Sequence, residues 1–350
     1  MNFCKLFKKE SVSSDKHEPY FRSCLSAKHK TVYDKMFICM NDCADETQIS
    51  TVSQKDLKII FESILKDHPI IFYTTKFQWS TSSASNEITF MPKYLYDKST
   101  IKNYKEKILK YLKIFDKVKD KSDYEKELFV HDHCLENFKY DYNFNESSYS
   151  AHGLVLYNTA VCEGIAEFVK LALDYLGVRC LVVYGEGKDP TGKTSVESHA
   201  WNIVEIDGKT YHLDVTFDMT IKNKINRYDY FNLCDTDIKK EHIIKDKAPA
   251  CNTCNADYLT KNSMVVNNLS DFETYIEKEL KSGKKHIMFK LLNHKFQDSL
   301  VDNLQKLAMQ KYLDIFGGSV SIQTGYNPSQ MVFEIEYQKQ TQAVKSLSGR

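Results

Sequence analysis

Charged and apolar residues alternate with a helical period between residues 162 and 176. The four charged positions are spaced three or four residues apart and would form one narrow stripe: Glu163, Glu167, Lys170 and Asp174. The apolar residues between them cover the remaining surface, and Gly177 stands where a left-handed residue would end the helix. The pattern therefore predicts a central helix over 162–176 that is buried on most sides.

Two strand-like segments, 199–206 and 209–217, follow this helix. They flank Asp207-Gly208, a dipeptide typical of a two-residue β-turn, so we expect a hairpin with residue 206 opposite residue 209. Because side chains alternate along a strand, one face of this hairpin should carry His199, Trp201, His212, Asp214 and Thr216. His199 and Asp214 would then be diagonal neighbours within reach of each other.

The rest of the chain is predicted to form helices and strands in three parts. Residues 1–53 are polar, and we expect a partly disordered N-terminal segment there. The second part, 54–248, contains the central helix and the hairpin. The third part, 249–350, is predicted to be a small C-terminal α+β subdomain. The further expected elements are helices over 54–66, 99–119, 123–138 and 296–315, a helix from the capping box Ser270/Glu273 to Gly283, and strands over 70–77, 285–292, 319–324 and 331–337.

Composition indicates a folded chain without a strong overall charge. Of the 350 residues, 42% are apolar and 13% aromatic, which supports a packed core. The net charge is +1, so no overall field would gather nucleic acid or an anionic membrane. The ten cysteines follow no compact framework, and we expect reduced thiols and a cytoplasmic location, with export still open. No apolar segment has the length of a membrane span.

Cys162 is the leading candidate for chemistry. A cysteine in the first turn of a helix faces unpaired backbone N–H groups and the positive end of the helix dipole, and both favour thiolate over thiol. His199 and Asp214 could supply a base and a group that orients it, provided that the hairpin lies against the start of the helix. We therefore predict a Cys-His-Asp nucleophilic site.

The segments that carry these residues resemble a known family. In order they are Ala160-Val-Cys-Glu-Gly164, Ser198-His-Ala-Trp-Asn202 and Tyr211-His-Leu-Asp-Val-Thr-Phe-Asp218. They are similar to the three catalytic blocks of the transglutaminase-like superfamily, particularly its bacterial members, and the resemblance covers roughly residues 55 to 260. It implies an α+β, papain-like core with the nucleophile at the N-terminus of a central helix packed on an antiparallel sheet. It also implies Cys162 as nucleophile, His199 as general base and acid, and Asp214 as its orienter. Phe217 and His152 depart from the pattern, where many relatives carry Trp and Tyr.

The resemblance implies acyl transfer through a thioester on Cys162, without a cofactor, on a protein or peptide substrate. The oxyanion would be held by the Cys162 backbone N–H and by a second donor from Tyr149, Tyr157 or Asn158, with Tyr157 and Trp201 as the candidate substrate or oxyanion residues. Hydrolysis, deamidation and cross-linking all stay open. The alternative is a module that holds a protein or a peptidoglycan peptide without turnover. The oligomeric state is not predicted.

Two rival motifs have simpler interpretations. Residues 187–194 match the phosphate-loop pattern, but the next segment is predicted to be a strand and Pro190 removes a donor, so we expect an exposed loop between strands. Cys251-Asn-Thr-Cys254 could be half of a zinc site with Cys39-x-x-x-Cys43 or Cys234. A single pair favours a surface turn with incidental thiols, and we expect no metal.

Two histidine positions are also expected to be structural. His131-Asp-His133-Cys134 lies in a helical pattern that turns neighbours to different sides, which favours a position on the helix surface or at the edge of the core. His212 could hydrogen-bond to Asp214, but packing against the core is the favoured interpretation.

Overall fold

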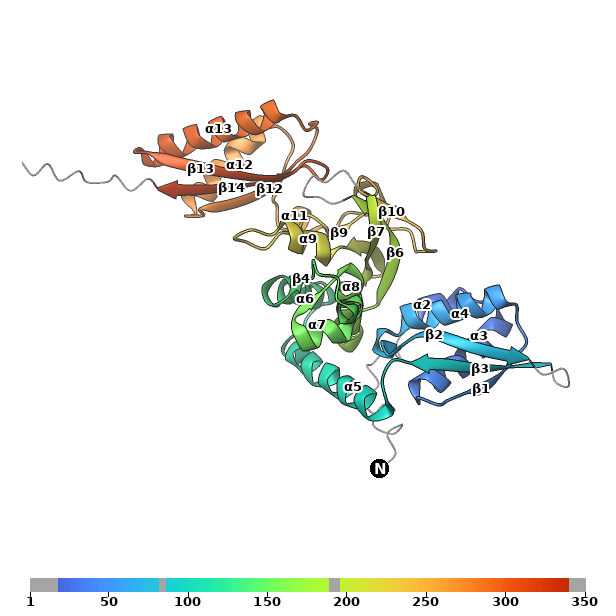
Figure 1. The fold of residues 1–350 in the computed structure, drawn as a ribbon. Coiled ribbons are helices and arrows are strands. Elements are labelled where there is room, and N and C mark those ends of the chain that lie inside the picture. The colour runs from blue at the N-terminus through green and yellow to red at the C-terminus, as the bar shows by residue number, and fades with distance from the viewer. Residues whose placement is uncertain (1–17, 82–85, 189–195, 340–350) are drawn as a thin grey trace, which may run out of the picture.

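The computed structural model describes residues 18–81, 86–188 and 196–339. Figure 1 shows three units in a row, with a central unit between the other two. We name them the N-terminal unit (18–96), the central unit (97–257) and the C-terminal unit (258–339). Each combines helices with a largely antiparallel sheet, which confirms the predicted α+β class.

The N-terminal unit packs helices against a three-stranded sheet in the order β1-β3-β2. Its elements are α2 (Tyr20–Ser23), α3 (Ala27–Asn41), β1 (Thr47–Ser50), α4 (Gln54–Asp67), the 3-10 helix η2 (Pro69–Ile71), β2 (Thr74–Thr81) and β3 (Glu87–Tyr94). Because β1 pairs with β3 and α3 contacts α4, the predicted boundary after residue 53 falls inside this unit, and we propose a boundary near residue 96 instead. Sequence periodicity missed β1, whose only buried residue is Ile49.

The central unit places helices against a five-stranded sheet in the order β10-β6-β7-β8-β9 (Figure 1). Its helices are α5 (Lys98–Leu112), η3 (Lys113–Val118), α6 (Asp123–Asn137), η4 (Glu146–Tyr149), α7 (Ala151–Tyr157), α8 (Cys162–Tyr175), α9 (Val215–Ile221) and α10 (Asp235–Ile238). Its strands are β4 (Lys139–Tyr140), β5 (Thr159–Ala160), β6 (Cys180–Lys188), β7 (Val196–Ile206), β8 (Lys209–Leu213), β9 (Phe231–Leu233) and β10 (His242–Ile244). Helix α8 lies across β6 and β7, so the apolar side of the predicted central helix forms the core with the sheet.

The predicted hairpin is present with the predicted register. Ile206 pairs with Lys209, and Asp207 and Gly208 both have positive φ angles, as a tight two-residue turn requires. The second strand is shorter than predicted, because β8 ends at Leu213. Asp214 instead caps α9, where its Oδ1 accepts a hydrogen bond from the Phe217 N–H at 3.0 Å.

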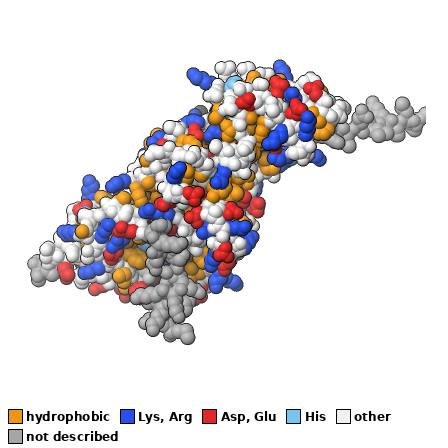
Figure 2. Space-filling view, turned by 180° about the vertical axis from the view of Figure 1, so that it is seen from behind, with side chains coloured by type: hydrophobic (Ala, Val, Ile, Leu, Met, Phe, Trp, Pro, Cys, Tyr) orange, Lys and Arg blue, Asp and Glu red, His pale blue; other side chains and the backbone are white. Residues whose placement is uncertain are grey.

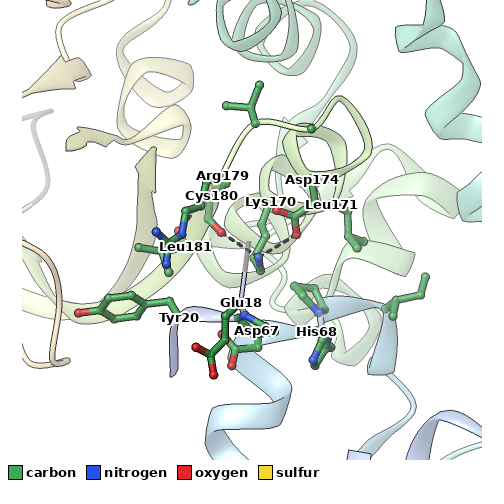
Figure 3. A pocket seen from close by; sticks show the side chains of 15 residues that line it. Glu18, Tyr20, Asp67, His68, Lys170, Leu171, Asp174, Arg179, Cys180 and Leu181 are labelled. Atoms are coloured by element: carbon green, nitrogen blue, oxygen red, sulfur yellow. Dashed lines mark hydrogen bonds and ion pairs between the residues drawn. The ribbon is translucent and has the colours of Figure 1, made fainter. Parts of the chain in front are cut away.

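The charged stripe of α8 does not face solvent as its pattern suggested. Lys170 is buried, and its Nζ donates to Asp174 Oδ2 and to the Cys180 carbonyl oxygen, both at 2.8 Å (Figure 3). These residues line a small pocket with Asp67 and His68 from the end of α4, so the stripe faces the N-terminal unit. The N- and C-terminal limits of the helix agree with the prediction, including a positive φ at Gly177.

The C-terminal unit has its own apolar core and a four-stranded sheet in the order β11-β12-β14-β13. Its elements are α11 (Tyr258–Lys261), β11 (Val265–Val266), α12 (Leu269–Lys281), β12 (His286–Leu291), α13 (Asp298–Phe316), β13 (Val320–Asn327) and β14 (Val332–Lys339). The predicted helices and strands of this region are therefore present. Asn268 caps α12 in place of the predicted Ser270, because its side chain accepts from the Asp271 N–H at 2.9 Å.

The cysteines differ from the expectation of reduced thiols. Cys234 and Cys254 form a disulfide, and Cys251 is fully buried, so the predicted surface turn with incidental thiols is wrong. Acidic and basic side chains are interspersed over the face shown in Figure 2. Within the described ranges no helix combines the length and apolarity needed to cross a bilayer.

Candidate active site

Cys162 occupies the first turn of α8 and is partly exposed. The chain is fixed just before it, because the Val161 N–H donates to the Ser148 carbonyl oxygen at 3.0 Å. Gly164 lets η4 approach the helix, since a Cβ at this position would lie 2.5 Å from the same Ser148 oxygen. Among the described residues no side chain caps α8, so the amides of its first turn remain available at the site.

His199 and Asp214 are brought together as the hairpin register predicts. His199 Nε2 donates to Asp214 Oδ2 at 2.7 Å, and both side chains are buried. Since Nε2 is used by Asp214, the other ring nitrogen, Nδ1, is left to address the Cys162 thiol. Cys162 is close enough to His199 to contribute to the raised pKa of the imidazole, and α8 packs on β7, so the hairpin lies against the start of α8.

The charged forms of His199 and Asp214 stabilise each other. Burial disfavours the protonated His199 ring, but the charge and hydrogen bond of Asp214, together with the interaction with Cys162, raise the pKa of His199 to about 10. Burial alone would raise the pKa of Asp214. The charge of His199 and hydrogen bonds from two histidines instead hold that pKa well below its ordinary value of 3.8. An imidazolium–carboxylate pair is therefore favoured at neutral pH.

The His199 ring stacks with two aromatic rings. Phe217 stacks on one side at 4.5 Å between ring centroids, and Trp201 lies parallel at 5.8 Å. Gly187 on β6 leaves the space for this arrangement, because a Cβ there would lie 3.1 Å from His199 Cδ2 and 3.0 Å from Phe217 Cζ. The phenylalanine that departs from the family pattern thus contacts the His199 ring directly.

Trp201 and His212 have structural contacts. Trp201 is 1% exposed, and its Nε1–H donates to His212 Nδ1 at 3.1 Å, so the indole N–H is engaged within the protein and not free for an oxyanion. His212 Nε2 in turn donates to Asp235 Oδ1 at 2.9 Å. Burial lowers the pKa of His212 to about 4 despite that carboxylate. These contacts agree with the favoured interpretation of His212 as a core histidine. Its hydrogen-bond partner is Asp235, whereas the other possibility considered from the sequence was Asp214.

Several tyrosines precede Cys162 in the chain. Tyr149 and Tyr157 are exposed side chains of the short helices before Cys162, and Asn158 ends α7 with a positive φ. Tyr140 was not identified from the sequence, although β4 pairs with β5 immediately before Cys162. Burial and the proximity of Cys162 raise the pKa of the Tyr140 hydroxyl, so it is a neighbour of the thiol.

His242 is the second residue that sequence reasoning missed. It lies on β10 and donates from Nε2 to Asp214 Oδ2 at 2.9 Å, so that one carboxylate oxygen accepts from two imidazoles. No motif links His242 to Asp214, because the two residues come together only when β10 pairs with β6.

Among the described residues, three groups of side chains have the composition of metal ligands, and each contains an internal hydrogen bond or disulfide. The first is His199, Asp214 and His242, whose nitrogens share one oxygen through hydrogen bonds. The second joins His212 and Asp235 with Cys251, and the third contains both sulfurs of the Cys234–Cys254 disulfide.

The remaining motif predictions can be compared with the fold. His131 is fully buried, and its Nε2 donates to Asp218 Oδ2 at 3.1 Å, so its predicted position on the helix surface or at the edge of the core is wrong. Most of the phosphate-loop match, residues 189–194, lies outside the described residues. The strands on either side of it, β6 and β7, are antiparallel neighbours, and no helix follows the loop as a phosphate site would need.

A thiol at the start of a helix, beside an imidazole that a buried carboxylate orients, is an arrangement able to generate a nucleophile. With the helix packed on an antiparallel sheet, it defines a cysteine-protease-like fold. The family model of the transglutaminase-like superfamily matches residues 113–215, a segment that contains Cys162, His199 and Asp214. This match confirms the predicted resemblance for that part of the chain.

Solved structures give weaker likenesses. A TGase shares 14% identity at a TM-score of 0.31, with 52% of this chain and 53% of that chain covered. A candidate cysteine protease from Cytophaga hutchinsonii shares 13% at 0.24, with 49% and 65% covered, and a candidate protease from Parabacteroides distasonis shares 12% at 0.22, with 40% and 36% covered. The chain spans less than two thirds of each of these proteins, and such TM-scores support no argument. No curated protein matches the sequence.

Proposed function

We propose that the protein is a cysteine-dependent acyl-transfer enzyme acting on the amide bonds of a protein or peptide. Cys162 would be its nucleophile, His199 its general base and acid, and Asp214 the residue that orients the base. The observation that carries the proposal is the position of His199, hydrogen-bonded to Asp214 at 2.7 Å on one side and interacting with Cys162 on the other. A histidine with a purely structural role in the core would not require both a carboxylate and a thiol as partners.

The reaction would proceed in two steps. The Cys162 thiolate attacks the amide carbonyl carbon, a C–S bond forms, and the C–N bond breaks while His199 Nδ1–H gives its proton to the departing amine. Water or an amine then attacks the thioester, His199 takes up the proton of that acceptor, and the thiolate leaves. Asp214 keeps its charge and holds the ring throughout.

The oxyanion of each tetrahedral intermediate needs hydrogen-bond donors at the start of α8. The backbone N–H of Cys162 is one, since the first amides of a helix lack intrahelical partners. Tyr140 is a further candidate because its hydroxyl neighbours the thiol. The partly buried surroundings would strengthen these interactions relative to bulk water.

The first test is the pH dependence of iodoacetamide labelling at Cys162, located by mass spectrometry. A thiolate–imidazolium pair predicts labelling that persists below neutral pH, and this acidic labelling should disappear in His199→Ala. Cys24 is exposed and serves as a reference thiol in the same digest. If Cys162 and Cys24 follow the same pH profile in both proteins, the enzyme proposal is refuted and a binding module is favoured.

The acceptor is tested with a glutamine-rich protein and a tagged primary amine. Ammonia release without incorporation of the amine indicates deamidation, incorporation indicates cross-linking activity, and new peptide termini indicate proteolysis. Each activity should be absent in Cys162→Ala. If Cys162 labels as a thiolate but none of the three products forms, the reactive site is supported and these substrates are excluded.

A further inference from the structure

We propose that His242 is a positioning residue for the catalytic group, a second imidazole that fixes the carboxylate of Asp214 so that Asp214 can hold His199. The inference rests on the proposed function. It assigns to the site a fourth side chain that lies on a different strand from the other members, 28 residues beyond Asp214.

Three hydrogen bonds hold the carboxylate of Asp214. Its Oδ1 accepts the Phe217 N–H at 3.0 Å as the cap of α9. Its Oδ2 accepts from His199 at 2.7 Å and from His242 at 2.9 Å. The bond from His242 therefore fixes the plane of the carboxylate independently of His199, and the oxygen stays in place while the His199 ring gains and loses its proton.

The surroundings of His242 hold its ring in one orientation. It is buried against Trp201 at 4.9 Å and Phe217 at 4.7 Å between ring centroids, the same two rings that enclose His199. Its backbone pairs with Gly187, the residue whose missing side chain leaves room for His199. A displacement of His242 would therefore disturb Trp201 and Phe217, the two rings that stack with His199.

The tautomer of His242 follows from its hydrogen bonds. Nε2 must carry the proton that Asp214 accepts, whereas Nδ1 is buried without a hydrogen-bond partner among the described residues. The other titratable groups that face this ring are His199 on β7, His212 on β8 and the Tyr230 hydroxyl before β9. The one hydrogen bond of this ring among the described residues is therefore the bond from Nε2 to Asp214 Oδ2.

The experiment compares His242→Gln with His242→Leu in the full-length protein. Glutamine can place an amide N–H near the position of Nε2 and keep the bond to Asp214, whereas leucine keeps bulk and removes the donor. For His242→Leu we expect roughly a 10- to 100-fold slower labelling of Cys162 by iodoacetamide at about pH 6, as the loss of a hydrogen bond to a charged group predicts. His242→Gln should recover most of the rate, and both variants should approach the parent rate at alkaline pH, where every thiol ionises.

His199→Ala measured alongside separates the two proposals. If His199→Ala removes acidic labelling and His242→Leu leaves it unchanged, the role of His242 is refuted while the proposed function stands. If His199→Ala itself has no effect, the proposed function fails first. Equal losses in the Gln and Leu variants, or a loss that persists at alkaline pH, would show that His242 acts through packing and would overturn the proposal. Near-UV circular dichroism verifies that each variant is folded.

Discussion

Asp214→Asn provides the sharpest test of the charge arrangement at the site. Asparagine keeps the size of the side chain and can still cap α9, but it removes the negative charge that two histidines share. Without that charge, burial is the dominant influence on His199 and disfavours its protonated form. The pKa of His199 should therefore fall below its ordinary value of 6.5.

The size of the effect follows from the pKa of His199 in the parent protein. A rise from 6.5 to about 10 corresponds to about 5 kcal/mol in favour of the imidazolium. Loss of the whole shift would return the pKa of His199 to its ordinary value of 6.5, so the charged fraction at neutral pH would fall from nearly all to roughly one quarter. Each further decrease of one in this pKa through burial would lower the charged fraction by roughly tenfold. We expect a similar decrease in the labelling of Cys162 and in any amide turnover.

The assay is the rate of Cys162 labelling from about pH 5 to pH 10, with the site located by mass spectrometry. Asp235→Asn is the matched control, because it changes the His212–Asp235 pair on the same sheet and leaves the Asp214 contacts in place. The control should keep the parent profile. An Asp214→Asn protein with the parent profile would refute the reasoning, since it would show that the carboxylate does not set the charge of His199.

Three further measurements test the structure. The His199–Asp214 pair should stabilise the fold most between about pH 4 and pH 6.5, and this stabilisation should decline toward pH 10. The lowered pKa of Asp214 contributes fully above 3.8, and the raised pKa of His199 contributes fully only below 6.5. Urea unfolding of the parent protein and of Asp214→Asn measures the difference. Gly187→Ala should lower stability by about 1 to 3 kcal/mol and slow Cys162 labelling, because its Cβ would press on the His199 ring. Cys254→Ser should cost about 3 kcal/mol of unfolding free energy by opening a loop with a sequence separation of 20, measured by denaturant unfolding.

Each of these has a result that would contradict it. A parent-to-variant stability difference that grows above pH 7 would reverse the expected sign for His199. Gly187→Ala should be compared with Glu186→Ala on the same strand, and equal effects would show that contact with His199 is not the cause. Exposed Cys24→Ser is the control for the disulfide, and an unchanged stability of Cys254→Ser would show that the bond is not formed in solution.

Local patterns predicted much of the fold. The period of α8, its end at Gly177, the Asp207-Gly208 turn and the hairpin register were all predictable, because each depends on neighbouring residues and on backbone sterics. The C-terminal helices and strands followed in the same way. The shorter β8 was not predicted, since Asp214 fits a strand pattern equally well until its side chain caps a helix.

The sequence by itself therefore determined many of the elements and placed His199 within reach of Asp214, because a hairpin converts residue spacing into distance. Only the tertiary structure decided what converges on them from elsewhere. It brought Cys162 to the imidazole, His242 to the shared carboxylate oxygen and the charged stripe of α8 against the N-terminal unit. These contacts join segments with no local rule between them, and they form because burying the apolar faces of the helix and the sheet fixes the polar groups at their edges.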